Sequence, residues 1–224
     1  MPLTLHYHPL SSHCWKLLIA LAENGAPHDL QLVNLGDPAA RTAYAALWPT
    51  AKIPLLVDGD RVVPETSIQM EYLDHAYPGA TRLLPGDFDS QLQVRLWDRL
   101  FDQYVMDPMQ RYIAQVLRPP EARDTQAMAA HEAALGQAYD LIEARRGDST
   151  WAVGESFSMA DCSAAPALFY ATVIRPLGAE HTRLAAYHER LLARPSVWAA
   201  IVQARPWFPY YPLRERLSAR FLSD

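Results

Sequence analysis

The stretch "LTLHYHPLSSHCWKLLIALAENG", residues 3–25, decides the fold because it joins two elements of different periodicity. Its first part, Leu3–Tyr7, alternates apolar and polar side chains, which is typical of a β-strand. From Cys14 onward the apolar residues recur three and four positions apart, which predicts a helix that ends at Asn24-Gly25. A strand that leads directly into a helix is the beginning of an α/β unit.

The residues that follow continue this unit. They predict a strand, a short helix with proline in its first turn, a hairpin around Asp58-Gly59 and a further helix, at 28–35, 38–48, 55–63 and 66–77. Pro78-Gly79 closes the last of these helices. The sequence therefore predicts a βαβαββα domain over residues 1–79.

The pattern changes after about Leu84, because no convincing strand follows. Helical stripes of apolar residues run to the end of the chain, and Asp107-Pro108 and Pro166 are expected to interrupt or bend two of the helices. Ser158 and Asp161 have the spacing of a capping box, which predicts a helix start there. The second predicted domain is all-α and covers residues 86–224.

The composition excludes several classes of function. The 224 residues carry a formal charge of −5 with scattered basic residues, so neither nucleic acid nor an anionic membrane surface is an expected partner. The apolar run Leu17–Ala22 is too short for a signal or membrane segment. The two cysteines form neither a disulfide framework nor a metal-ligand spacing, so we expect a cytoplasmic protein without a metal.

The segment "SSHC" (11–14) lies where the first helix begins, and three interpretations stay open. Ser11 or Ser12 is a cap for the unpaired N–H groups of the helix, or one hydroxyl donates a hydrogen bond to a bound anion such as a thiolate. Cys14 is either a thiol whose pKa is lowered by the helix end or a small buried side chain.

Two further motifs are compatible with a binding cleft and with ordinary structure. Pro54 either simply starts a strand or, with a cis Ile53-Pro54 bond, turns the polar backbone groups of Ile53 toward a cleft. Thr66 is expected to cap the helix that begins there, and the alternative is that this helix end binds a ligand carboxylate.

Taken together, the chain resembles the glutathione S-transferases over essentially its whole length. The resemblance rests on Ser11, on "IP" at 53–54, on "ET" at 65–66, on "SMAD" at 158–161 and on "ARPSVWA" at 193–199. It implies a thioredoxin-like domain followed by a helical domain, a cytoplasmic homodimer and a role in detoxification. It also implies glutathione as cosubstrate, with its thiolate attacking a small, apolar electrophile.

The resemblance also implies roles for individual residues. Ser11 donates to the glutathione sulfur, with Ser12 as the substitute candidate. The backbone of Ile53, exposed by Pro54, pairs with the cysteinyl unit. The γ-glutamyl end is held by Thr66 at its carboxylate and Glu65 at its ammonium, and the glycine carboxylate by Lys52 with Arg41 behind it. The electrophile pocket is expected at His8, Pro9, Leu10, Tyr104, Asp107, Arg111 and Tyr112, with the tail "RPWFPYYPL" (205–213) folded over it.

Departures from the family pattern leave rival functions open. "SSHC" keeps only the second cysteine of a redox Cys-x-x-Cys motif, which excludes a local disulfide between positions 11 and 14. A glutathione-dependent thiol oxidoreductase or peroxidase would have to use Cys14. A non-catalytic binding module of the same fold is the other alternative. The isomerase branch carries a cysteine and two arginines where this chain has His13, Lys16 and Leu18, so isomerase activity is not expected.

Overall fold

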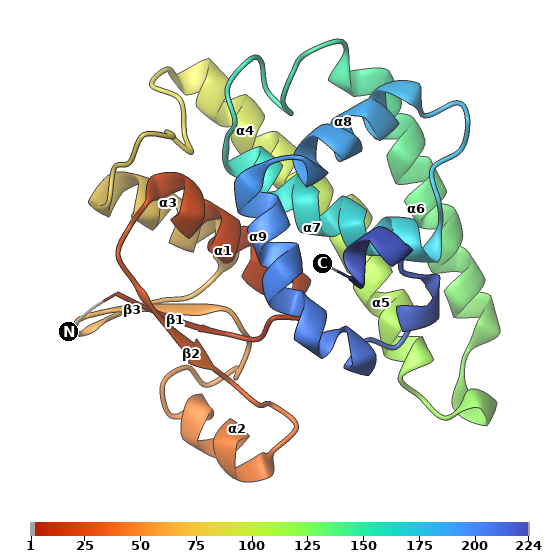
Figure 1. The fold of residues 1–224 in the computed structure, drawn as a ribbon, viewed down its shortest axis with the longest axis horizontal. Coiled ribbons are helices and arrows are strands. Elements are labelled where there is room, and N and C mark those ends of the chain that lie inside the picture. Colours follow the sequence, from red (N-terminus) through yellow and green to blue (C-terminus); the bar gives the residue numbers. More distant parts are fainter. Residues whose placement is uncertain (1–2, 224) are drawn as a thin grey trace.

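The first part of the chain folds around a small mixed sheet (Figure 1). The computed structural model describes residues 3–223. The sheet has the order β2-β1-β3-β4, with β1 parallel to β2 and antiparallel to β3. The predicted βαβαββα order is confirmed, with bounds β1 (Thr4–Tyr7), α1 (Ser12–Asn24), β2 (Asp29–Leu32), α2 (Pro38–Ala45), β3 (Leu55–Asp58), β4 (Arg61–Val63) and α3 (Thr66–Ala76).

Helices cover this sheet on both faces because neighbouring strand residues point in opposite directions. Leu56 of β3 joins the main core beneath α1 and α3, whereas Leu55 packs with Val33 and Tyr44 of α2 in a smaller cluster. In Figure 1 the helix α2 accordingly lies away from α1 and α3, beyond β2. The two layers hold the C-terminal end of β1, where α1 begins, in a fixed position.

The second part of the chain is helical, as predicted. It comprises α4 (Phe88–Leu100), a π-helical turn (Phe101–Met106), α5 (Asp107–Val116), α6 (Thr125–Arg146), α7 (Met159–Ile174), α8 (Thr182–Leu192), α9 (Pro195–Ala204) and short 3-10 turns as far as Phe221. The capping box of α7 is confirmed, because Asp161 accepts from the Ser158 N–H at 2.9 Å. No helix within residues 3–223 combines the length and apolarity that a membrane span requires.

The two prolines expected to disturb helices lie in different settings. Pro108 lies in the first turn of α5, and the π-helical turn before it is the interruption of the regular α-helix that was predicted there. Inside a regular α-helix, proline removes a backbone hydrogen bond and its ring clashes with the preceding turn. The wider π-helical turn leaves room for the ring and does not need that hydrogen bond. α7 runs as one helix across Pro166.

The central helix α1 connects the two parts of the molecule. Its apolar residues are buried almost all round, between the sheet and α3 on one side and α7 and α9 on the other. Glu23 near its end forms an ion pair with Arg194, at 2.6 Å. Gly25 closes the helix with a φ of 67°, a left-handed conformation that glycine adopts without strain.

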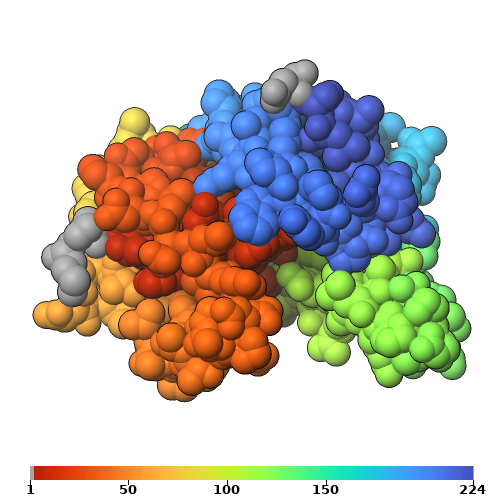
Figure 2. All heavy atoms as spheres, turned by 60° about the horizontal axis from the view of Figure 1, so that its bottom comes forward, coloured from red at the N-terminus to blue at the C-terminus, as the bar shows by residue number. Residues whose placement is uncertain are grey.

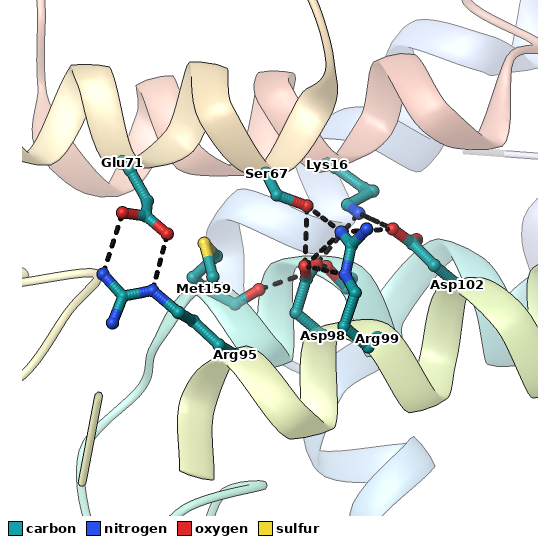
Figure 3. Close-up of polar contacts among 9 residues, drawn as sticks. Lys16, Ser67, Glu71, Arg95, Asp98, Arg99, Asp102 and Met159 are labelled. Carbon is teal, nitrogen blue, oxygen red and sulfur yellow. Dashed lines mark hydrogen bonds and ion pairs between the residues drawn. The ribbon is translucent and has the colours of Figure 1, made fainter. Parts of the chain in front are cut away.

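A buried polar network lies where α1 meets α4 (Figure 3). The Lys16 ammonium donates to Asp98 at 3.0 Å and to Asp102 at 2.8 Å, and it is fully buried. Asp98 also accepts hydrogen bonds from Ser67 of α3 and from Ser163 of α7. Burial by itself raises the pKa of Asp98, but Lys16 and the hydrogen bonds outweigh it and lower that pKa to about 2. Arg99 of α4, which is half-exposed, also donates to Asp98 and Asp102. The network therefore ties four helices together through the buried charges of Lys16 and Asp98 and the partly exposed charges of Asp102 and Arg99.

Candidate active site

A cleft opens at the N-terminal end of α1, between the two parts of the chain. Its volume is about 990 Å³, and its floor includes Ser11 and His13 of α1. In Figure 2 a hollow lies between the orange residues around α2 and the green residues around α5 and α6. A second cavity of about 360 Å³ adjoins the cleft, because both are lined by His13, Lys52, Ile53, Glu65 and Asp102.

Ser11 is both a helix cap and a lining residue of the cleft. It is the N-cap of α1, and its Oγ accepts a hydrogen bond from the Cys14 N–H at 3.3 Å. A hydroxyl that accepts one hydrogen bond still has its own hydrogen to donate. The two functions that the sequence left open for Ser11 are therefore compatible with each other.

Ser12 and Cys14 point away from the cleft. Ser12 is buried, and its Oγ accepts a hydrogen bond from Gln110 of α5 at 2.9 Å. Cys14 is fully buried, and burial raises the pKa of its thiol to about 12 despite hydrogen bonds from Ser11 and His8 that lower it. The structure thus contradicts the interpretation of Cys14 as an activated thiol, because an apolar environment disfavours the thiolate. Cys14 is a small core residue.

Both thiols should consequently resist chemical modification in the folded protein. Cys162 is also fully buried, and its pKa is raised. We expect neither thiol to react with a disulfide reagent at pH 8 before unfolding, and both to react in denaturant. Spectrophotometric thiol counting checks this. Rapid labelling of Cys14 in the native state would restore the oxidoreductase alternative.

The backbone before β3 contributes the next part of the site. The Ile53-Pro54 peptide bond is cis, which is the isomer that the sequence alone could not establish. Gln69 of α3 donates to the Pro54 carbonyl at 3.0 Å and so connects this bend to the helix. Tyr44 of α2 donates to the Lys52 carbonyl at 2.9 Å. Ile53 is thereby held at the boundary between the two cavities.

The start of α3 differs from the prediction. Thr66 was expected as the cap, but it is the first helical residue, and Glu65 is the N-cap, with a φ of 65° and no side-chain capping bond. A positive φ at a residue other than glycine costs free energy and concentrates at functional sites. The first N–H groups of α3 have no side-chain acceptor, which suits them to bind an anion. Both residues line the smaller cavity.

The predicted electrophile pocket is only partly assembled in the cleft. Asp107 and Arg111 line it and form an exposed ion pair at 2.8 Å. They also border a third cavity of about 440 Å³, together with Tyr104. Tyr112, by contrast, is buried in the main core, so its placement in the pocket was wrong.

The loop after β1 is also outside the cavities described above. His8 packs edge-on against Trp207 with ring centroids 4.8 Å apart, and the Pro9 carbonyl accepts from the Trp15 indole at 2.6 Å. Leu10 packs against the main core. None of the tail residues lines the cleft: Phe208 and Tyr211 pack on α7 against Phe169 and Tyr170, and Tyr210 is exposed.

Sequence reasoning missed several residues that line the cleft. Gln103 and Gln110 lie four and three positions from Asp107 and so share its helical face. This polar stripe was the sequence signal that could have identified them. The position of Asp102 in the cleft could not be predicted from α-helical spacing, because Asp102 lies in the π-helical turn, which changes which residues share a face. Within residues 3–223, no group of three or more histidine, cysteine, aspartate or glutamate side chains is arranged to hold a metal ion.

Comparisons with known proteins agree with this architecture. The profile of the glutathione S-transferase N-terminal domain matches residues 10–76, and that of the C-terminal domain matches residues 125–190. A glutathione S-transferase of Hyoscyamus muticus is 26% identical over 211 residues, which cover 91% of this chain and 99% of that protein.

Two solved structures resemble this chain in both fold and sequence. A glutathione S-transferase from Methylobacillus flagellatus KT with GSH bound has a TM-score of 0.80 and 27% identity, and covers 88% of this chain and 98% of that one. One from Methylobacterium radiotolerans, in complex with glutathione sulfonate, has a TM-score of 0.77 and 28% identity, and covers 89% and 94%. With both domains matched in order along one continuous fold, the chain belongs to the glutathione S-transferase family.

Proposed function

We propose that this transferase activates the thiol of glutathione through the Ser11 hydroxyl and directs the thiolate at a small electrophile. The observation that carries the proposal is that Ser11 lines a cleft of about 990 Å³ at the start of α1. Its hydroxyl hydrogen is free to donate while its oxygen caps the helix. Glutathione-bound relatives support the choice of thiol.

The magnitudes of the two contributions are sufficient for activation. A hydrogen bond to a charged group contributes about 1.5–3 kcal/mol. The positive end of α1 adds about 0.3–1 kcal/mol. At roughly 1.4 kcal/mol per pKa unit, together they lower the pKa of a thiol from about 8.5 by about one to three units. The S–H proton then leaves to solvent and the electron pair stays on sulfur. The thiolate forms a C–S bond with the electrophilic carbon, and the leaving group departs with its bonding electron pair, as chloride does from a chloronitroarene.

The rest of the tripeptide would lie along the two cavities. Ile53 offers backbone groups to the cysteinyl unit, and Lys52 with Arg41 offers positive charge to the glycine carboxylate. Thr66 and the open end of α3 would bind the γ-glutamyl carboxylate, with Glu65 at the ammonium. The location of these residues on the walls of the adjoining cavities supports this arrangement.

The electrophile would lie on the α5 side of the sulfur. The wall there carries Asp107 and Arg111 and continues into the cavity of about 440 Å³, whose lining includes Tyr104, Pro108 and Leu141. This combination favours an electrophile with an apolar body, as expected from the sequence, and a polar substituent near Arg111.

We further propose that the protein is a homodimer, that it is located in the cytoplasm and that its role is detoxification. The adjacent helices α3 and α4, which are joined by the Glu71–Arg95 ion pair at 2.8 Å, expose large apolar side chains at Ile68, Phe88 and Leu92. An exposed apolar face of this kind supports association with a second copy. The two buried free thiols suit a reducing compartment.

Glutathione titration tests the binding half of the proposal. We expect the wild type to bind glutathione in a calorimetric titration and Thr66→Ala to bind it about 10- to 100-fold more weakly, because a hydrogen bond to a charged carboxylate is lost. Thr125→Ala is the matched control, since Thr125 is also the first residue of a helix but lies outside the cleft. No heat from the wild type at millimolar glutathione would favour the non-catalytic binding module.

A further inference from the structure

The first turn of α1 presents three side chains after its cap, and they have different surroundings. Ser12 is buried against Gln110, and Cys14 is buried in the core. His13, in contrast, lines the cleft together with Ser11. A group two residues from the proposed thiol-binding hydroxyl therefore faces the same space.

The imidazole of His13 lies at the junction of the two cavities. It lines both of them, as do Ile53 and Glu65. No hydrogen bond joins this imidazole to another residue that the structure describes. A half-buried polar ring without a protein partner, at the place where the cysteinyl unit would lie, has a hydrogen-bonding capacity that a ligand can use.

The protonation state of His13 follows from the groups around it. Burial, the largest cause, lowers its pKa below the usual value of 6.5, and the ammonium groups of Lys16 on the same helix and Lys52 before β3 lower it further. The carboxylates of Asp102 from the π-helical turn and of Glu65 at the start of α3 oppose them, and the net pKa is lowered. At neutral pH the ring is therefore neutral and carries one N–H donor.

We propose that His13 donates a second hydrogen bond to the glutathione thiolate, beside the one from Ser11. This proposal rests on the proposed function, because it uses the same bound thiol. Two hydrogen bonds would then stabilise the negative charge on the sulfur. The Ser11 hydroxyl donates from the N-cap of α1, and the His13 imidazole donates from its first turn. The S–H proton leaves to solvent, so His13 changes neither its charge nor its proton count. The neutral donor stabilises the anion without placing a cation beside Lys16 and Lys52.

The pKa of the bound thiol measures this role directly. With saturating glutathione, the ultraviolet absorbance of the thiolate is followed against pH in the full-length protein. We expect His13→Ala to raise the thiol pKa by about one to two units, as the loss of a hydrogen bond to a charged group predicts. His13→Asn keeps an N–H donor and should recover most of the shift. His13→Phe fills the space without a donor and should raise the pKa as His13→Ala does.

The controls separate this inference from the proposed function. His75 at the end of α3 is exposed and lies outside the cavities described above, so His75→Ala should leave the thiol pKa unchanged. If the thiol pKa rises in Ser11→Ala but stays at the wild-type value in both His13→Ala and His13→Phe, the role of His13 is overturned and the proposed function stands. If the wild type shows no glutathione binding, both are overturned.

Discussion

Replacing Ser11 by alanine is expected to lower kcat/KM for conjugation of glutathione to a chloronitroarene by roughly 10- to 100-fold at neutral pH. The substitution removes the hydroxyl donor to the thiolate, while the cleft and the helix end remain. Because the bound thiol then ionises at higher pH, the loss should shrink as the pH is raised toward the pKa of a free thiol. A pH series of conjugation rates measures both effects.

The same substitution also removes a helix cap, so stability needs its own control. The Asp124 side chain caps α6 by accepting from the Ala127 N–H at 2.9 Å, and it lies outside the cleft. Asp124→Ala should therefore cost about 1 kcal/mol of stability, as Ser11→Ala does, without a loss of turnover. Ser11→Thr retains the hydroxyl and should retain most of the activity. Full activity in Ser11→Ala would show that a group other than the Ser11 hydroxyl activates the glutathione thiol.

Lys16→Met is expected to lower the free energy of unfolding by about 3–5 kcal/mol, the largest effect on stability that we predict. The substitution removes the buried ammonium that lies between the carboxylates of Asp98 and Asp102, and it leaves them with the half-exposed guanidinium of Arg99. A buried carboxylate that loses its buried counter-charge is strongly disfavoured in a low-dielectric interior. Urea unfolding followed by circular dichroism measures the change.

Two comparisons test whether burial causes this effect. Asp148→Ala breaks the exposed Arg183–Asp148 pair and should change stability by no more than about 1 kcal/mol. The contribution of Asp98 should be complete above its ordinary pKa of about 4. It should be lost as the pH falls through its folded value of about 2. Wild-type stability in Lys16→Met would show that the network does not hold the helices together.

The fold was largely predictable because its signals are local. The alternation in Leu3–Tyr7 and the helical spacing from Trp15 to Ala22 specify β1 and α1, and Asp58-Gly59 specifies the hairpin. Pro108 shows the limit of such signals. A proline within a helical pattern predicts an interruption, but only the packing of the surrounding helices determines that a π-helical turn provides it.

The candidate site was less predictable, since burial depends on which face of a helix meets a neighbour. Nothing within "SSHC" distinguishes the buried Ser12 and Cys14 from the cleft-lining His13, because the packing of α5 and of the core makes that distinction. Tyr112 is an aromatic residue of the kind that lines substrate pockets, but it lies on the face of α5 that is buried in the core. Asp107 and Arg111 line the same cleft as Ser11 because they follow the π-helical turn on the face toward it, and their contact with an electrophile stays a prediction.

The position of the glutathione sulfur in a crystal of the complex tests the central claim most directly. The proposed function predicts the sulfur within about 3.5 Å of the Ser11 Oγ, a hydrogen-bond distance for sulfur, with the peptide along Ile53 and its γ-glutamyl end at Thr66. A sulfur held beyond contact with Ser11, or a tripeptide bound elsewhere on the molecule, would contradict it.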